Sequence, residues 1–191
     1  MKINYRVFVF LIFIILTSCK NDENPFQPNT SDPVVSLTKG NIYCYHFYNR
    51  SDYVLYDWFG NYEVTGDTVI NHIKYSIINN ERFERADNTK LYSYINGNEI
   101  IKLEYDISKG DIIPFLNRIV IVDSMKQENI FSKNQNVIYV SNKISSSDTL
   151  ITGKYTMIYG VLSYSESYNN FTDGYSLSGA LIDGIEYGQI Y

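Results

Sequence analysis

Aromatic residues are the side chains whose number and spacing in this sequence best suit ligand binding. The chain holds 19 Tyr, 10 Phe and 1 Trp among 191 residues. Tyr43, Tyr45, Tyr56 and Trp58 come from two neighbouring segments, which would gather their rings into one patch if they pair as strands. Such rings stack on sugar faces or pack at protein interfaces. A purely structural role is the alternative, because tyrosine is also a good strand residue with a buried body and an exposed tip.

Residues that bind metals or activate nucleophiles form no recognisable pattern. The two histidines, His46 and His72, are far apart in the sequence and lack the spacing of metal ligands. Cys44 lies in an alternating segment, and we expect a buried, inert thiol there. The sequence contains neither a phosphate-binding glycine loop nor a nucleophile elbow. We therefore predict no metal and no cofactor.

Carboxylates are present, but no pattern selects a catalytic pair. Glycoside hydrolysis needs two of them across a cleft. The available glutamates include Glu81, Glu84, Glu99, Glu104, Glu166 and Glu186. The run 81–85 alternates charges poorly for one strand face, and we expect local surface ion pairs there, which contribute little stability. We predict a non-catalytic binding module for a glycan or a protein, with a hydrolase of surface polymers or a structural part of an envelope complex as alternatives.

The first nineteen residues carry an export signal. Two basic residues precede an unbroken run of ten apolar residues, 7–16, which is too short to span a membrane and has the length of a signal-peptide core. Leu16-Thr17-Ser18-Cys19 follows and resembles the lipobox of bacterial lipoproteins. The resemblance implies that residues 1–18 are removed and that Cys19 is acylated. Two acyl chains already suffice for stable attachment to a membrane, which is the first partner that we predict.

Residues 19–33 read as the lipidated cysteine and a flexible tether. Three of the four prolines lie here among polar residues, without apolar periodicity. The run Lys20-Asn21-Asp22-Glu23 resembles the short tract that exports lipoproteins to the cell surface in Bacteroidota. We therefore expect a location in the outer membrane, with the periplasmic and the external face both open.

The rest of the chain, 34–191, has the composition of a single β-domain. The whole chain has 25 Ile and two Ala, and this excess of β-branched residues over alanine favours strands over helices. Strands are expected at 41–49, 53–59, 67–71, 73–79, 82–86, 90–95, 99–105, 118–124, 136–141, 149–152, 154–163, 175–182 and 185–190. Asn96-Gly97, Asp173-Gly174 and Asp183-Gly184 are typical of hairpin turns. We predict an all-β fold with little or no helix, an antiparallel meander that closes as a barrel or folds as a sandwich.

Two segments of the domain resemble each other. Residues 67–78 and 148–158 both read as a strand, a tight turn and a second strand. An internal duplication and two hairpins under the same constraints both explain the similarity.

A longer resemblance covers most of residues 40–191. The segment 66–75 resembles Gly-Asp-Thr-Val-Ile-Asn-Gly-x-x-Tyr, a pattern of uncharacterised secreted and lipid-anchored Bacteroidota proteins, with His72 in place of the second glycine. Further matches follow in order at 85–92, 104–111, 159–162 and 183–187. The resemblance implies a β-rich domain at an envelope location, and it implies no activity.

Charge and short modification patterns complete the prediction. The formal charge is -5, and removal of Lys2 and Arg6 with the signal peptide makes it -7. An acidic chain of this kind does not suit nucleic-acid binding. Thr68, Ser124 and Thr149 each follow an aspartate in a three-residue pattern that resembles the O-glycosylation sequon of exported Bacteroidota proteins.

Overall fold

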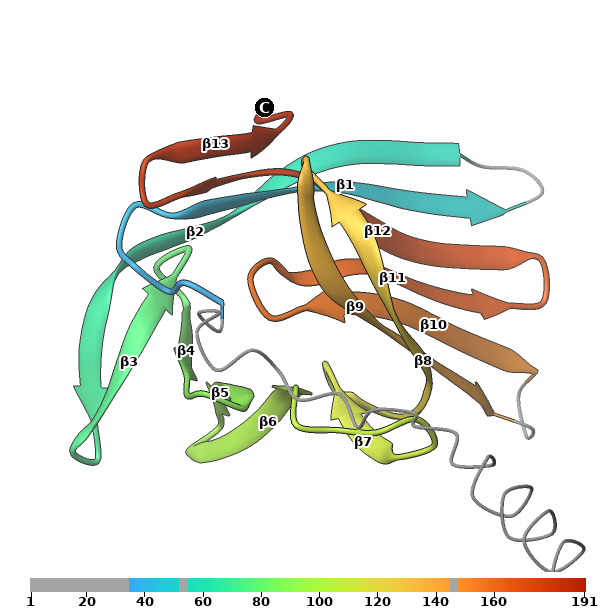
Figure 1. The fold of residues 1–191 in the computed structure, drawn as a ribbon, viewed down its shortest axis with the longest axis horizontal. Coiled ribbons are helices and arrows are strands. Elements are labelled where there is room, and N and C mark those ends of the chain that lie inside the picture. The colour runs from blue at the N-terminus through green and yellow to red at the C-terminus, as the bar shows by residue number, and fades with distance from the viewer. Residues whose placement is uncertain (1–34, 52–54, 145–147) are drawn as a thin grey trace, which may run out of the picture.

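The computed structural model describes residues 35–51, 55–144 and 148–191. All regular secondary structure within these ranges is β-strand. Figure 1 shows the arrangement. The strands are β1 Ile42–Ser51, β2 Leu55–Ile70, β3 Ile73–Ile78, β4 Arg82–Ala86, β5 Lys90–Ile95, β6 Asn98–Glu104, β7 Ile112–Phe115, β8 Arg118–Ile130, β9 Lys133–Ile144, β10 Thr149–Thr156, β11 Gly160–Tyr168, β12 Phe171–Ile182 and β13 Ile185–Gly188. The prediction of an all-β, antiparallel fold is confirmed. In the described residues no helix has the length and apolar character needed to cross a membrane.

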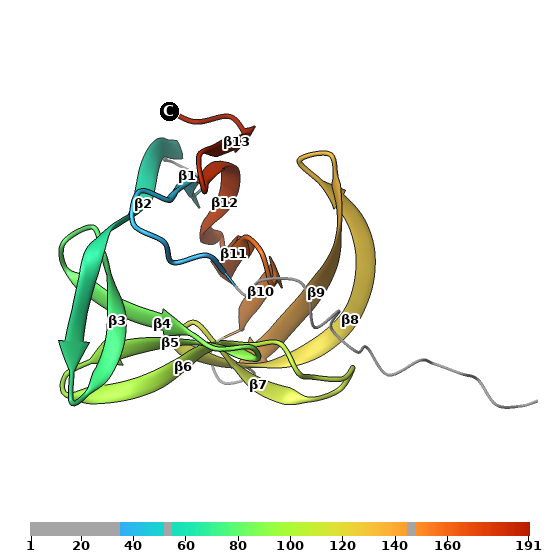
Figure 2. The ribbon, with the colours of Figure 1, turned by 60° about the vertical axis from the view of Figure 1, so that its left-hand side comes forward.

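The strands form one meander that curls into a nearly closed barrel. Strands β1 to β12 follow one another round the sheet in chain order, and β12 returns to pair with β1. The ends of this path are β6 and β7, which meet where the amide of Leu116 donates to the carbonyl of Lys102 over 2.8 Å. Figure 2 shows the strands curving round a central space, with β13 added to β12 outside the path. Of the two predicted architectures, the structure has the barrel.

Five of the described turns place two consecutive residues in the left-handed region. Asn96-Gly97 and Asp183-Gly184 form two of them, as predicted, with positive φ at every position. Asn71 and His72 form another, with φ of 49° and 66°. A histidine therefore completes this two-residue turn.

Two glycines that suggested turns lie inside strands instead. Gly174 is part of β12, so the predicted turn at Asp173-Gly174 is wrong. Gly153 is part of β10, so the predicted break between 149–152 and 154–163 is also wrong. In both cases packing requires the glycine: a Cβ at Gly174 would lie 2.6 Å from the Tyr48 hydroxyl, and a Cβ at Gly153 would collide with the Phe115 ring.

The internal similarity between 67–78 and 148–158 does not extend to the structure. The first segment is the β2–β3 hairpin, whereas the second runs along β10 as a single strand. The predicted strands at 53–59 and 67–71 are likewise one strand, β2, which bends at a register shift between Val64 and Gly66. A bulge of this kind turns a long strand without ending it.

The barrel interior holds the hydrophobic core. Aromatic and β-branched side chains dominate it, including Tyr43, Tyr105, Tyr155 and Tyr159, each with at most 2% of its surface exposed. The thiol of Cys44 is free and buried, as predicted, but does not belong to this core cluster. The hydroxyl groups of Tyr43 and Tyr155 donate to backbone carbonyls. Those of Tyr105 and Tyr159 have no hydrogen-bond partner among the described residues.

Candidate ligand-binding site

The two N-terminal strands point a set of aromatic side chains into the barrel. Successive strand residues face opposite sides of a sheet, so Tyr43, Tyr45 and Phe47 share the inner face of β1. On the neighbouring strand, Tyr62 lies opposite Tyr43 and Trp58 lies opposite Phe47. The period-two spacing in the sequence therefore places these rings on one concave surface.

The rings form a continuous row that starts at the exposed end of β2. Trp58 is 48% exposed and stacks on Phe47, with centroids 5.3 Å apart and an interplanar angle of 8°. Phe47 contacts Tyr175 at 5.4 Å, and Tyr175 contacts Tyr164 at 5.6 Å. Gly60 makes room for this packing, because a Cβ there would lie 3.0 Å from the Phe47 ring.

The row continues into the core. Tyr164 contacts Phe115 at 6.3 Å, Phe115 contacts Tyr155 at 5.5 Å, and Tyr155 contacts Tyr105 at 5.7 Å. We call these seven residues the aromatic row: Trp58, Phe47, Tyr175, Tyr164, Phe115, Tyr155 and Tyr105. Its rings lie 5 to 7 Å apart, the range in which tilted and offset aromatic pairs attract one another. One end of the row is half exposed and the other is fully buried.

A pocket of about 390 Å³ opens beside this row inside the barrel. Its volume is within the usual range of small-molecule sites, roughly 300 to 1,000 Å³. Phe47 and Tyr175 of the aromatic row are part of its wall. The other lining residues are Val35, Tyr43, Tyr45, Tyr62, Arg82, Glu84, Leu91, Ser93, Ile95, Lys102, Leu103, Leu116, Asn117, Tyr159, Gly160 and Val161. We call it the barrel pocket.

An ion pair lies in the wall of the barrel pocket. The Lys102 ammonium donates to Glu84 Oε1 over 2.7 Å and to the Tyr62 hydroxyl over 2.9 Å. The Ser93 hydroxyl donates to the same Glu84 oxygen over 3.3 Å. Glu84 is 1% exposed, and its second oxygen, Oε2, has no hydrogen-bond partner in the described part of the chain. A buried carboxylate oxygen without a partner is costly, so this atom requires an explanation.

A free guanidinium lies in the same wall. Arg82 stands over the Tyr62 ring, with its Cζ 5.9 Å from the centroid. Among the described residues no carboxylate pairs with Arg82, whose neighbour Glu84 is paired with Lys102. The pocket wall therefore contains two cations and one anion, although the whole chain is acidic.

The phenols around the pocket stay protonated. Burial raises the pKa of Tyr62 well above its ordinary value, and the negative charge of Glu84 raises it further. Burial likewise raises the pKa of Tyr45. These hydroxyl groups remain neutral hydrogen-bonding groups at physiological pH, which suits recognition of a polar ligand.

A second polar cluster lies beside the aromatic row. Arg118 Nη2 contacts both oxygens of Glu166, at 3.1 and 2.9 Å, and the Tyr164 hydroxyl donates to Glu166 over 2.6 Å. The hydrogen bond from Tyr164 is the leading cause of the lowered pKa of Glu166, and Arg118 adds to the effect. Burial raises the pKa of Tyr164 to about 12. The cluster is therefore a fixed set of hydrogen-bonding groups next to the rings.

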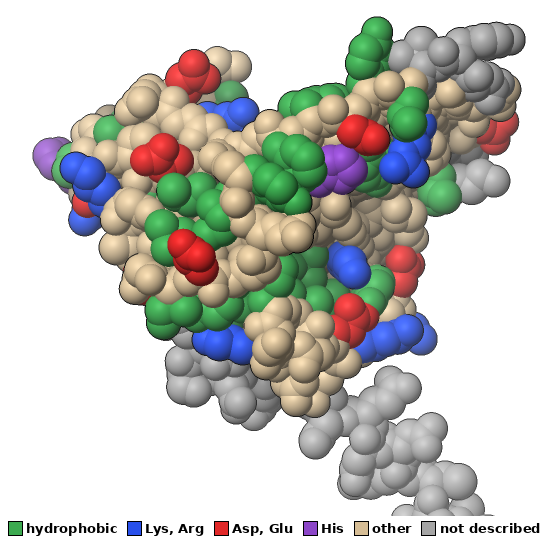
Figure 3. Space-filling view, turned by 90° about the horizontal axis from the view of Figure 1, so that it is seen from above, with side chains coloured by type: hydrophobic (Ala, Val, Ile, Leu, Met, Phe, Trp, Pro, Cys, Tyr) green, Lys and Arg blue, Asp and Glu red, His purple; other side chains and the backbone are tan. Residues whose placement is uncertain are grey.

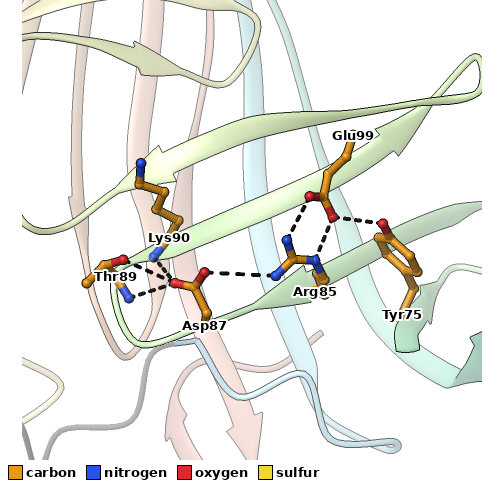
Figure 4. Close-up of polar contacts among 6 residues, drawn as sticks. All are labelled: Tyr75, Arg85, Asp87, Thr89, Lys90 and Glu99. Atoms are coloured by element: carbon orange, nitrogen blue, oxygen red, sulfur yellow. Dashed lines mark hydrogen bonds and ion pairs between the residues drawn. The ribbon is translucent and has the colours of Figure 1, made fainter. Parts of the chain in front are cut away.

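The opposite face of β4 carries a different network, shown in Figure 4. Arg85 donates to both oxygens of Glu99, over 2.6 and 2.7 Å, and the Tyr75 hydroxyl donates to Glu99 over 2.7 Å. The hydrogen bond from Arg85 is the main cause of the lowered pKa of Glu99. Asp87 accepts hydrogen bonds from the backbone amides of Thr89 and of the following residue. The predicted local ion pairs in 81–85 are therefore wrong, because Glu84 and Arg85 pair with residues of β6.

The outer face of β1 and β2 also carries aromatic residues, but they pack against one another. The His46 ring lies 5.0 Å from Phe59, and Phe59 lies 4.1 Å from Tyr191. Phe59 is 49% exposed, nearly the same as its neighbour Trp58 on the inner face. Figure 3 shows hydrophobic side chains on the surface mixed with acidic and basic ones. None of the three residues His46, Phe59 and Tyr191 lines the barrel pocket.

The structure brings together three of the four aromatic residues selected from the sequence. Tyr43 and Tyr45 line the barrel pocket and Trp58 begins the aromatic row. Tyr56 shares their face, 63% exposed toward the end of β2. Sequence reasoning missed Tyr175, because the pairing of β12 with β1 that brings it here has no local signal.

The predicted modification sites, the histidines and the predicted lipidation site lie apart from the barrel pocket or outside the described residues. Thr68 and Ser124 are half-buried on β2 and β8, whereas Thr149 is buried at the start of β10 and is poorly placed for modification. His46 lies 3.4 Å from Asp57, and the described residues contain no group of three that could hold a metal ion. Cys19, the signal peptide and the tether lie outside the described residues.

Comparison of the chain with models of protein families, with curated proteins and with solved structures finds no match. The barrel pocket, the aromatic row and the charges beside them are therefore the basis for a functional conclusion. Each is a property of side chains whose contacts are described above.

Proposed function

We propose that this protein is a non-catalytic glycan-binding module held at the outer membrane by a lipid anchor. The observation that carries the proposal is the aromatic row, which leads from half-exposed Trp58 to the wall of the barrel pocket. A concave surface of this kind suits a small or extended ligand that enters the barrel pocket. A protein partner with a flat interface would instead contact an outward-facing patch.

The chemistry of the site matches that of a sugar chain. A sugar ring has an apolar face of C–H groups and an edge of hydroxyl groups. The rings of Trp58 and Tyr175 offer faces for the former. The polar groups of Glu84, Lys102 and Arg118 offer hydrogen bonds for the latter.

Binding accounts for the site better than hydrolysis does. A glycoside hydrolase needs two carboxylates on either side of the bond that it cleaves. Glu84 is the one carboxylate among the described residues that line the barrel pocket, and Lys102 occupies one of its oxygens. This arrangement supports recognition without an acid–base pair.

The proposed binding test uses the one tryptophan of the chain as a reporter. Purified full chain is screened on an array of bacterial and host glycans, and each hit is titrated while Trp58 fluorescence is followed. We expect Trp58→Ala to weaken binding about tenfold, the equivalent of ~1.4 kcal/mol. Calorimetry measures this variant, because it lacks the reporter.

Phe59→Ala is the matched control, because Phe59 is adjacent and equally exposed but faces outward. We expect its affinity to stay within about twofold of the parent, well under 1.4 kcal/mol. Failure of well-folded protein to bind any glycan rejects the proposal. An equal loss in both variants rejects the aromatic row as the binding surface.

The proposed anchor has its own test. Cells that express the chain are fed labelled palmitate, and we expect incorporation that Cys19→Ala abolishes. Protease treatment of intact cells then distinguishes the external from the periplasmic face. Absence of label on the parent protein rejects the anchor and leaves the binding proposal to its own experiment.

A further inference from the structure

Resting on the proposed function, we infer that the barrel pocket takes an acidic sugar at the end of a glycan chain. The sugar carboxylate pairs with the Arg82 guanidinium, and one ring hydroxyl donates to Glu84 Oε2. The proposal names the ligand class as a chain-terminal uronic acid. It follows from the Glu84 carboxylate and the Arg82 guanidinium in one pocket wall, which also holds the unpartnered Tyr159 hydroxyl, and from the buried part of that wall.

The first unmatched group is an acceptor. Glu84 Oε2 has no partner among the described residues, although Lys102 and Ser93 both bond to Oε1. Glu84 lines the barrel pocket, but its Oε2 is closed to solvent, so a donor that satisfies this atom has to displace the side chains that now separate it from the pocket. A hydroxyl group is the simplest neutral donor, and sugars carry several.

The second group is an exposed cation. Arg82 is exposed at the pocket wall, with a ring contact to Tyr62 and no ion-pair partner in the part of the chain that is described, so it is available to an anion. A guanidinium prefers a planar carboxylate, which it binds through two parallel hydrogen bonds. With Lys102 also in the wall, the pocket has a net charge of about +1 (two cations, one anion) within an acidic protein. An anionic ligand matches this local field.

The core closes part of the pocket wall, where Leu103 and Leu91 are 0% and 3% exposed. The aromatic row reaches the surface at Trp58, on the other side of Phe47. The proposal therefore places the terminal unit of a glycan in the pocket and its following units outside it.

Two methyl glycosides test the charge preference directly. Methyl β-D-glucuronide and methyl β-D-glucoside share every ring hydroxyl and differ only in the group on C5. Each is titrated into purified full chain while Trp58 fluorescence or the heat of binding is followed. We expect the glucuronide to bind at least tenfold more tightly than the glucoside.

Two arginine variants assign that preference to a residue. Arg82→Gln is expected to bring the ratio of the two affinities close to one. Arg50→Gln is the matched control, because Arg50 also stands over a tyrosine ring, that of Tyr48 at 5.0 Å, but on the outer face. It is expected to keep the full preference. Circular dichroism verifies that both variants retain the β-sheet signal.

A third variant tests the hydroxyl contact. Glu84→Gln combined with Lys102→Gln removes both charges of the pair while keeping polar groups of similar size. We expect it to weaken the glucuronide and the glucoside by the same factor, because both carry the hydroxyl. Unchanged affinity for both sugars overturns the assignment of Glu84.

The outcomes separate this inference from the proposed function. Equal affinity for the two glycosides in the parent, or a preference that survives Arg82→Gln, overturns the inference. If Trp58-dependent binding of neutral glycans persists in that case, the glycan-binding function stands. If no glycan and neither glycoside binds, both are rejected.

Discussion

Two adjacent residues of β4, Glu84 and Arg85, lie on opposite faces of the sheet and form ion pairs of opposite character. Inside the barrel, Glu84 pairs with Lys102, and the two side chains are 1% and 17% exposed. On the other face, Arg85 pairs with Glu99, and these are 24% and 27% exposed. The outer pair uses both carboxylate oxygens and gains a third hydrogen bond from Tyr75.

The difference separates a structural pair from a binding pair. The outer network in Figure 4 connects three strands and satisfies its groups with one another. The inner pair is more deeply buried but leaves one oxygen without a donor. A protein that needed only stability would complete the inner pair first, since an unmatched buried polar atom costs more than an exposed one. The inner pair is therefore the one that we propose to take part in ligand binding.

The largest expected effect comes from breaking the inner pair on one side. Lys102→Met leaves the Glu84 carboxylate buried without its cation, and we expect the free energy of unfolding to fall by about 3 to 5 kcal/mol. Urea denaturation followed by circular dichroism measures the change. Lys102→Met combined with Glu84→Leu is expected to recover most of it, because no charge is then left unpaired. A single variant as stable as the parent would show that the inner pair is not buried in solution.

The next effect concerns the packing of the inner face. Gly153→Ala places a methyl group against the Phe115 ring, and we expect a loss of about 1 to 3 kcal/mol. Gly66→Ala is the control, because the nearest atom to a Cβ there is 3.8 Å away. Thermal melts of the two variants give the comparison. A Gly153→Ala protein that melts with the parent would contradict the tight aromatic row.

Breaking the outer pair, Arg85 with Glu99, should lower the free energy of unfolding by a smaller amount, and this loss should depend on pH. Glu99→Gln removes the charge that Arg85 and Tyr75 bind, and we expect a loss of about 1 kcal/mol near pH 7. The pKa of Glu99 in the folded state lies below its ordinary 4.5. The ionised Glu99 side chain therefore stabilises the fold in full above its ordinary pKa of 4.5. This stabilisation is lost as the pH falls through the lower pKa of the folded state. Urea titrations from pH 7 to pH 3 should show the two proteins converging, and a constant difference would refute the assignment.

The smallest effect is expected at a fully surface-exposed pair. Lys74 contacts Asp67 at 2.8 Å, and the two side chains are 71% and 43% exposed. Solvent screens such a pair, so Lys74→Met should change the free energy of unfolding by no more than about 0.5 kcal/mol. Unfolding in low and high salt measures it. A loss as large as that of Glu99→Gln would remove the distinction between the partly buried pair of Arg85 and the exposed pair of Lys74.

The fold was predictable where the signals are local. Alternating residues and the Asn96-Gly97 turn place β5 and β6 correctly, because both signals lie within a few residues. The choice of a barrel was not predictable, since it depends on the pairing of β1 with β12 across the whole domain. Gly153 and Gly174 misled the prediction because a neighbouring ring, and not a turn, requires each glycine.

The aromatic half of the candidate site was predictable, because it too depends on local signals. Tyr43, Tyr45 and Trp58 lie on two adjacent strands, so their shared face follows from period-two spacing. The polar half of the site was not, because Glu84 finds its partner Lys102 on β6, with β5 between them. No local pattern distinguishes Glu84 from the other glutamates, and only the three-dimensional structure shows which one is buried.

The attachment of the tether has a mechanical consequence. Val35, the first described residue, is buried in the core, and the chain then runs into β1, which is hydrogen-bonded to β2 on one side and to β12 on the other. Under the proposed attachment at Cys19, tension from a captured polymer would reach the domain through β1. A central strand pulled along its length has to shear two ladders at once, whereas an edge strand has to break only one. The proposed anchor would therefore load the barrel through a strand that is paired on both sides, which would suit the proposed binding role.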